Sequence, residues 1–178
     1  MRGRLLNYLQ VSLRYTAVLE SLPVESAPEK WLGILQQPTS PQDLAELHGA
    51  AQRVIASYPT HPGLLFITAL SRPFLTTEDV KRSEEEAHAC ITHCKEGGQD
   101  LQSVAEAFLA FRNQGWAGST ALDGLVNDIV GNIYLDTGVD IDRLVPYLER
   151  DSVRNRWLAF VVQRSVIDSV SHSSREVA

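Results

Sequence analysis

The sequence predicts an all-α fold of eight or nine short antiparallel helices, and three observations support this fold class. Apolar residues recur every three to four positions along most of the chain, which is the spacing of a buried helix face. Helix start signals (Ser, Thr or Asp) and stop signals (Gly, Pro) follow one another at short intervals. The alternating apolar and polar runs that are typical of strands are nearly absent. Helices joined in this way pack either as stacked helical hairpins or as an irregular bundle.

Four helices are predicted in the first half of the chain. The first covers residues 4–20 and includes Leu13 in its buried stripe, and the second follows a cap at Ser26. Ser40 is a stronger start for the third helix, because its hydroxyl can accept from an amide of the first turn and an aspartate follows three positions later. The fourth helix, residues 63–71, is apolar almost all round, so we expect it to be the most buried element.

The second half continues with a long helix from Thr76 or Thr77 to Lys95, which Gly97 and Gly98 end in a left-handed conformation. Its acidic run, Glu84 to Glu86, is assigned to the solvated outer face. The opposite, buried stripe is predicted to contain Val80, Ala87, Cys90, Ile91 and Cys94. The remaining predicted helices are 100–113 with a cap at Asp100, 119–135, a brief helix from Asp140 that bends at Pro146, and 153–170 with a cap at Ser152.

Length and composition indicate one globular domain in a reducing compartment. The 178 residues are enough for a sizeable core, and the domain is expected to cover residues 1–170, with a disordered tail at 171–178. Two cysteines four positions apart do not make a disulfide framework, so we expect a cytoplasmic protein. The formal net charge of −6 disfavours general nucleic-acid binding, and no apolar stretch is long enough to span a membrane. The start of the chain lacks the features of a secretory signal.

A weak internal repeat connects the two middle parts of the chain. A shift of 36 residues superimposes Asp43 on Asp79 and Ala51 on Ala87, as two stacked hairpins would require. The alternative is a coincidence between two amphipathic helix pairs. The stretch 58–62, Tyr-Pro-Thr-His-Pro, followed by the apolar helix from Gly63, resembles the junction between tetratricopeptide repeats. The resemblance covers about residues 40–113, and it implies a surface that docks a peptide or protein.

The cluster His88, Cys90, His93 and Cys94 is the sharpest candidate for chemistry, since it places four possible metal ligands within seven residues. On a helix, however, His88 lies about 160° from Cys90, so one ion could not collect all four ligands. The simpler interpretation is two buried thiols and two exposed histidines. A cysteine nucleophile with one of these histidines, or with His48 or His61, is disfavoured, because a thiol in a mid-helix apolar stripe stays protonated.

The other polar clusters also have simple structural interpretations. Asp136, Asp140 and Asp142 lack the ligand spacing of a calcium loop, and neither glycine pair, Gly97 with Gly98 or Gly115 with Gly118, is followed by the Lys-Ser/Thr of a phosphate-binding loop. Five arginines near the end of the chain are set among acidic residues, so we expect them to pair within the molecule, although they could contact nucleic acid beside Trp157. These are Arg143, Arg150, Arg154, Arg156 and Arg164.

The sequence therefore assigns no catalytic, cofactor-binding or metal-binding residue. We expect no enzyme activity and no cofactor. The predicted function is a non-catalytic protein–protein interaction or scaffolding domain whose partner is another protein or a peptide. The alternative is an accessory helical domain of a nucleic-acid-processing ATPase or helicase complex, and no membrane partner is expected.

Overall fold

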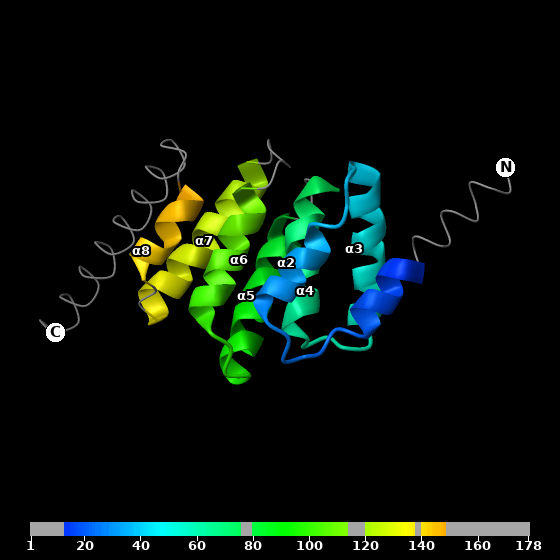
Figure 1. Cartoon of the computed structure of the whole chain (residues 1–178), viewed down its shortest axis with the longest axis horizontal. Coiled ribbons are helices and arrows are strands. Elements are labelled where there is room, and N and C mark those ends of the chain that lie inside the picture. The colour runs from blue at the N-terminus through cyan, green and yellow to red at the C-terminus, as the bar shows by residue number, and fades with distance from the viewer. Residues whose placement is uncertain (1–12, 76–79, 114–119, 138–139, 149–178) are drawn as a thin grey trace, which may run out of the picture.

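The structure, a computed structural model, describes residues 13–75, 80–113, 120–137 and 140–148, and it confirms the all-α fold (Figure 1). Within these ranges every regular element is helical. Residues 13–20 form a helix at one end of the molecule, here called the N-terminal helix. The elements that follow are α2 (Pro28–Leu35), α3 (Pro41–Ile55), α4 (Pro62–Ser71), the 3-10 helix η1 (Arg72–Phe74), α5 (Val80–Glu96), α6 (Leu101–Asn113), α7 (Thr120–Thr137), α8 (Ile141–Leu144) and the 3-10 helix η2 (Val145–Leu148).

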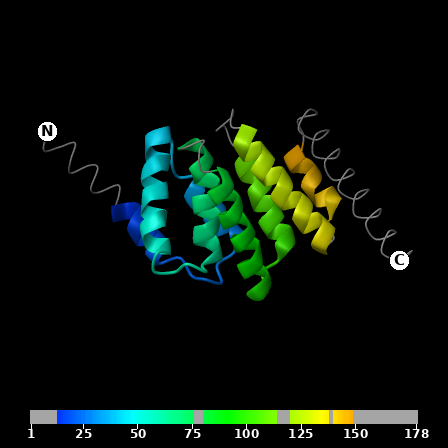
Figure 2. The ribbon, with the colours of Figure 1, turned by 180° about the vertical axis from the view of Figure 1, so that it is seen from behind.

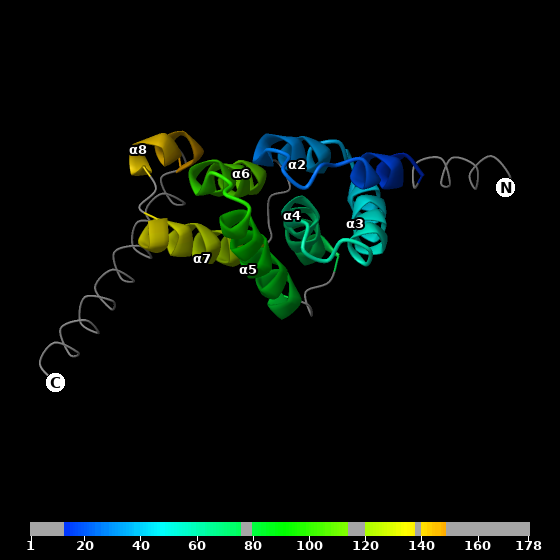
Figure 3. The same ribbon diagram turned by 90° about the horizontal axis from the view of Figure 1, so that it is seen from below.

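The helices lie in two layers, which Figure 3 shows from the side. The N-terminal helix, α2, α6 and α8 make up one layer, and α3, α4, α5 and α7 make up the other. The closest packing is between α4 and α5, followed by α6 on α7 and α3 on α4. From behind, Figure 2 shows α3, α4, α5 and α7 side by side. The N-terminal helix and α8 therefore stand at opposite ends of the long axis.

The short helix α2 makes the packing of the bundle irregular. It packs against both α4 and α6, although these two helices are far apart in the sequence. A regular stack of hairpins would pair α5 chiefly with α6, but α5 contacts α6 only slightly and packs mainly on α4. Of the two arrangements that the sequence allowed, the contacts favour the irregular bundle.

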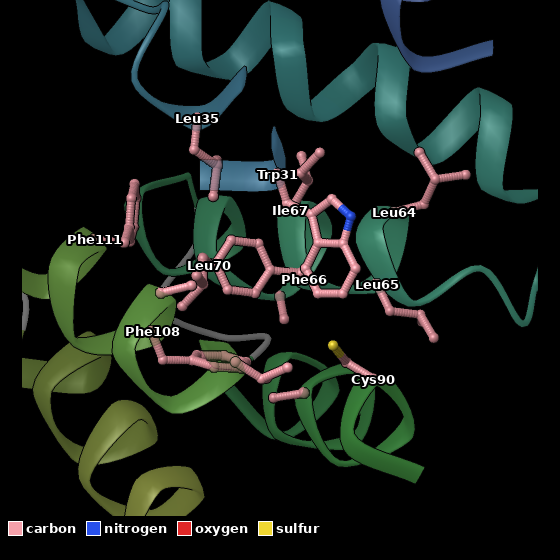
Figure 4. Packing of buried hydrophobic residues seen from close by; sticks show 14 of the residues in the cluster. Trp31, Leu35, Leu64, Leu65, Phe66, Ile67, Leu70, Cys90, Phe108 and Phe111 are labelled. Carbon is pink, nitrogen blue, oxygen red and sulfur yellow. The ribbon is translucent and has the colours of Figure 1, made fainter. Parts of the chain in front are cut away.

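Helix α4 is the centre of the core, as its sequence predicted. All ten of its residues are buried. Three large rings from three helices meet there (Figure 4): the Phe66 ring centroid lies 5.6 Å from that of Trp31 on α2 and 4.8 Å from that of Phe108 on α6. Since aromatic pairs at these separations attract each other beyond their buried area, Phe66 joins the two layers.

The predicted start of α3 is confirmed, because the Ser40 hydroxyl accepts a hydrogen bond from the Asp43 amide at 3.1 Å. Asp100 likewise bonds the first turn of α6 through the Gln102 amide, and Gly98 has the predicted positive φ, 71°. The prediction that Ser26 caps α2 is wrong. Ala27 occupies the cap position of α2, and the Ser26 hydroxyl instead accepts from the indole Nε1 of Trp31 at 2.8 Å.

Two predictions about helix faces need correction. Leu13 is 66% exposed, so the buried face of the N-terminal helix is made by Tyr15 and Leu19. On α5, Ala87, Cys90 and Cys94 are buried as predicted, but Val80 and Ile91 are only partly buried. Ser83 completes the buried face instead, one turn before Ala87.

The later helices agree with the sequence where the structure describes them. Helix α7 ends two residues beyond the predicted Leu135, and the bend at Pro146 is confirmed, because α8 gives way to a 3-10 helix there. The predicted cap at Thr76 or Thr77, the helix 153–170 and the tail 171–178 lie outside the described residues. None of the helices in the described ranges has the length and apolar character needed to cross a bilayer.

Replacing Gly63 by alanine is expected to lower the free energy of unfolding by about 1–3 kcal/mol, the range for overpacked cores. A Cβ atom at this position would lie 2.6 Å from Trp31 Nε1, so the indole must move and its bond to Ser26 must lengthen. Urea denaturation followed by circular dichroism measures the change. Gly33→Ala in α2 is the matched control, because a Cβ there meets nothing within 4 Å. It should stabilise the helix slightly, and equal effects of the two substitutions would contradict the prediction.

Candidate functional site

An open cleft is lined by residues of the N-terminal helix and of the C-terminal end of α3. Figure 1 shows these two helices next to each other at one end of the molecule. The volume of the cleft is about 660 Å³, which is in the range of ligand-binding pockets. The side chains that line it belong to Thr16, Glu20, Arg53, Val54, Ser57 and Tyr58. None of these residues was predicted from the sequence to belong to a site, although Tyr58 begins the stretch 58–62 that resembles the tetratricopeptide junction.

Both helices end at this cleft. The N-terminal helix ends with Glu20, and the amide of Leu22 donates to the Leu19 carbonyl at 3.3 Å. Helix α3 ends at Ile55, whose carbonyl accepts from the Tyr58 amide at 3.1 Å. The C-terminal end of a helix carries a partial negative charge. The partial negative charges at the C-terminal ends of these two helices therefore add to the negative charge of the Glu20 carboxylate.

The two charged side chains that line the cleft, Glu20 and Arg53, differ in their surroundings. Glu20 is exposed, and within the part of the chain that the structure describes its carboxylate makes no hydrogen bond and no ion pair. Arg53 is also exposed, but its side chain runs back along α3, since its Nη1 lies 3.6 Å from where a Cβ of Gly49 would be. The guanidinium is thus directed toward the preceding turn of α3 rather than toward the helix end.

The described lining offers several groups that can bind a polar ligand. Thr16, Ser57 and Tyr58 bring hydroxyl groups that both donate and accept hydrogen bonds, and the Tyr58 side chain is 52% exposed. Among the described residues of the lining there is no cysteine, histidine or lysine, and Glu20 is the one carboxylate. The arrangement can hold a polar ligand through a carboxylate, hydroxyls and one aromatic ring.

The histidine and cysteine cluster on α5 does not come together as a site. Both thiols are fully buried, and burial, assisted by the neighbouring Cys94 thiol, raises the pKa of Cys90. His88 is exposed as expected and faces Asp128 at 3.5 Å, whereas His93 is partly buried and bonds Glu96 at 2.9 Å. Among the described residues, no group of three or more His, Cys, Asp or Glu side chains is placed to hold a metal ion.

The two other candidate bases are engaged in the core. His48 on α3 is hydrogen-bonded through Nδ1 to the Ser71 hydroxyl at 2.6 Å. His61 precedes α4 and caps it, because its Nδ1 accepts from the Leu64 amide at 3.3 Å while its Nε2 donates to the Leu22 carbonyl at 3.0 Å. Each ring therefore joins separate elements, and neither bond involves a thiol.

The buried imidazole of His48 is expected to make the protein less stable in acid. Burial, assisted by the positive charges of Arg72 and Arg82, lowers its pKa from 6.5 to about 4. Between these two pH values the unfolded chain binds the proton and the folded protein does not, so stability falls as pH falls from 6.5 to 4 and the loss is complete below 4. The pKa difference corresponds to about 3 kcal/mol.

Urea denaturation at several pH values between 7 and 4 measures this loss. In His48→Gln, which has no titrating group but retains an amide for Ser71, the decrease in stability over this pH range should be smaller by about that amount. If the two proteins lost stability in parallel, the assignment to His48 would be wrong.

The acidic run on α5 was only partly assigned correctly. Glu84 and Glu85 are exposed as predicted, but Glu86 is not on the solvated face. Its side chain is only 14% exposed and pairs with Arg72 of η1, and Arg82 approaches the same oxygen at 3.2 Å. The side chain of Arg72 is itself 5% exposed. This ion pair joins η1 to α5 inside the molecule.

The acidic residues near Gly138 bond to different helices. Asp136 pairs with Lys95 of α5, and the Asp140 amide donates to the Gln102 side chain of α6 at 2.8 Å. The Asp142 amide donates to Asp140 Oδ1 at 3.0 Å. Their bonds thus connect α7 and the start of α8 to neighbouring helices, while Gly138 and the glycines Gly115 and Gly118 lie outside the described residues.

Of the arginines near the end of the chain, the structure describes Arg143. It pairs with Glu106 of α6 at 3.1 Å, so its expected intramolecular pairing is confirmed, with a partner distant in sequence. The other four arginines and Trp157 lie outside the described residues. Their pairing and their possible contact with nucleic acid stay predictions.

No protein-family model matches the chain, and no curated protein and no solved structure matches it either. The resemblance to tetratricopeptide repeats therefore stays a prediction.

Proposed function

We propose that this chain is a non-catalytic, cytoplasmic interaction domain that binds a segment of another protein in the cleft between the N-terminal helix and α3. The cleft carries the proposal, since its volume of about 660 Å³ and its polar lining suit a few residues of a peptide. Ser57 and Tyr58 are exposed there, so their side chains are accessible to a partner. The surrounding helices supply the rigid support that a recognition site needs.

The alternative function, an accessory domain of a nucleic-acid-processing complex, has less support. It depends on the arginines near the end of the chain, and Arg143 is already neutralised by Glu106. The formal net charge of −6 also opposes contact with a phosphate backbone.

Site-directed photo-crosslinking tests the proposal. A photoreactive phenylalanine analogue at Tyr58 should form a crosslink to a distinct protein in extract of the source cells. The same group at Thr92, exposed on α5, is the control position and should not form it. Filling the cleft by Ser57→Trp should abolish the crosslink, whereas Ala45→Trp, exposed on the same helix, should leave it intact.

Circular dichroism first establishes that both tryptophan variants keep the helical content of the parent protein. Equal crosslinking from both positions, or a Tyr58 crosslink that survives Ser57→Trp, would overturn the proposed site. Salt-sensitive retention of the protein on single-stranded DNA, with no protein crosslink, would favour the alternative function.

A further inference from the structure

The Glu20 carboxylate lines the cleft as its acidic group, together with the basic side chain of Arg53. It is solvent-exposed, and among the described residues no lysine, arginine or histidine lies within ion-pair distance of it. Arg53 lines the same cleft, but its guanidinium lies back along α3, with Nη1 3.6 Å from where a Cβ of Gly49 would be, and it forms no ion pair with Glu20. The acid is thus available to a charged group from another molecule.

The backbone strengthens the negative potential at the same place. The N-terminal helix ends at Glu20 and α3 ends at Ile55, shortly before Ser57 and Tyr58, so two helix C-termini, each with a partial negative charge, lie next to residues that line the cleft. Cations are stabilised at such helix ends and anions are not. The negative net charge of the chain acts in the same direction over longer distances.

Tyr58 adds a second way to hold a cation. Its side chain is 52% exposed and lines the cleft together with Glu20. The face of an aromatic ring attracts ammonium and guanidinium groups, and arginine is the commonest partner of this kind. A carboxylate beside an open ring therefore selects a long basic side chain over an acidic or a purely apolar one.

We infer that the cleft recognises a lysine or arginine side chain of the partner segment, with Glu20 as the ion-pair acceptor and Tyr58 as the aromatic wall. This inference rests on the proposed function, because it names the chemistry of the segment that the cleft binds. The backbone of the same segment would meet the hydroxyl of Ser57, which lines the same cleft.

Titration of the full-length, ¹⁵N-labelled protein with N-acetyl-arginine amide tests the inference by NMR. The amide signals of Glu20, Ser57 and Tyr58 should shift saturably, and N-acetyl-aspartate amide at the same concentration should not shift them. Glu20→Gln and Tyr58→Ala should each weaken binding by about twofold to fivefold, the range for an exposed charge or cation–π contact. Raising the salt concentration should weaken binding to the parent protein and have less effect on Glu20→Gln.

Glu25→Gln is the matched control, since it removes the same charge from another exposed glutamate. Together with Tyr58→Phe, which keeps the ring, it should bind arginine amide like the parent protein. Equal shifts with the aspartate probe, or equal weakening by Glu20→Gln and Glu25→Gln, would overturn the inference. If the Tyr58 crosslink formed while the arginine probe caused no shift, the inference would fail and the proposed function would stand. If the arginine probe bound but no protein crosslink formed, the proposed function would fail, while the preference of the cleft for a basic side chain would stand.

Discussion

Glu86→Gln is expected to lower the free energy of unfolding by about 3–5 kcal/mol, the usual cost of removing one partner from a buried ion pair. The substitution keeps the shape of the side chain but removes the charge that compensates Arg72. The Arg72 side chain is only 5% exposed, so its guanidinium cannot regain the lost interaction from water. Arg82, which approaches the same carboxylate, is 60% exposed and can turn to solvent.

Urea denaturation at pH 7, followed by circular dichroism, measures the effect. Glu85→Gln is the control, because that neighbour is exposed and its change should stay within about 0.5 kcal/mol. The double substitution Arg72→Met with Glu86→Gln should recover most of the loss, since replacing both members of a buried pair is often nearly neutral. A Glu86→Gln protein as stable as Glu85→Gln would show that the pair contributes little.

This ion pair also shows where sequence reasoning loses information. Glu86 belongs to a run of three glutamates, and a charge run on an amphipathic helix normally faces solvent. Periodicity places a residue on a helix face, but it does not tell which neighbouring element covers that face. Here η1 brings Arg72 against α5. The assignment of Glu84 and Glu85 to solvent succeeded, because none of the described elements covers these two exposed side chains.

The elements themselves were predictable because their signals are local. Ser40, Asp100 and Gly98 act on amides and carbonyls within a few positions of themselves, so the sequence is sufficient to place them. The cap of α4 was missed because histidine is not among the preferred cap residues. His61 takes that role because a second bond to the Leu22 carbonyl fixes its ring from outside the helix.

The candidate site was not predictable for a related reason. Glu20 and Tyr58 lie in different parts of the sequence, and the stretch 58–62 to which Tyr58 belongs gives no reason to bring it next to Glu20. They line one cleft because the N-terminal helix lies beside the end of α3, a consequence of tertiary packing. The clusters that are conspicuous in the sequence, such as Cys90 and Cys94, are held in the core by the apolar face on which they lie.

Phe66→Ala is expected to lower the free energy of unfolding by about 3–5 kcal/mol, because large aromatic residues in a core leave a cavity when they are truncated. Phe66 is fully buried, and its ring contacts both Trp31 and Phe108. The substitution removes both ring contacts at once, so it weakens the attachment of α2 and of α6 to α4. Denaturation should therefore begin at lower urea concentration for the whole bundle, as measured by circular dichroism and tryptophan fluorescence.

Tyr58→Ala is the control for Phe66→Ala, since it truncates an aromatic ring that is 52% exposed and should change stability by no more than about 0.5 kcal/mol. Phe66→Leu should cost less than Phe66→Ala, because leucine refills part of the cavity. Helical content in the absence of urea should stay close to that of the parent protein for all three variants. If Phe66→Ala cost no more than Tyr58→Ala, the three rings would not be the junction between the layers, and the stability of the bundle would have to come from the contact of α4 with α5.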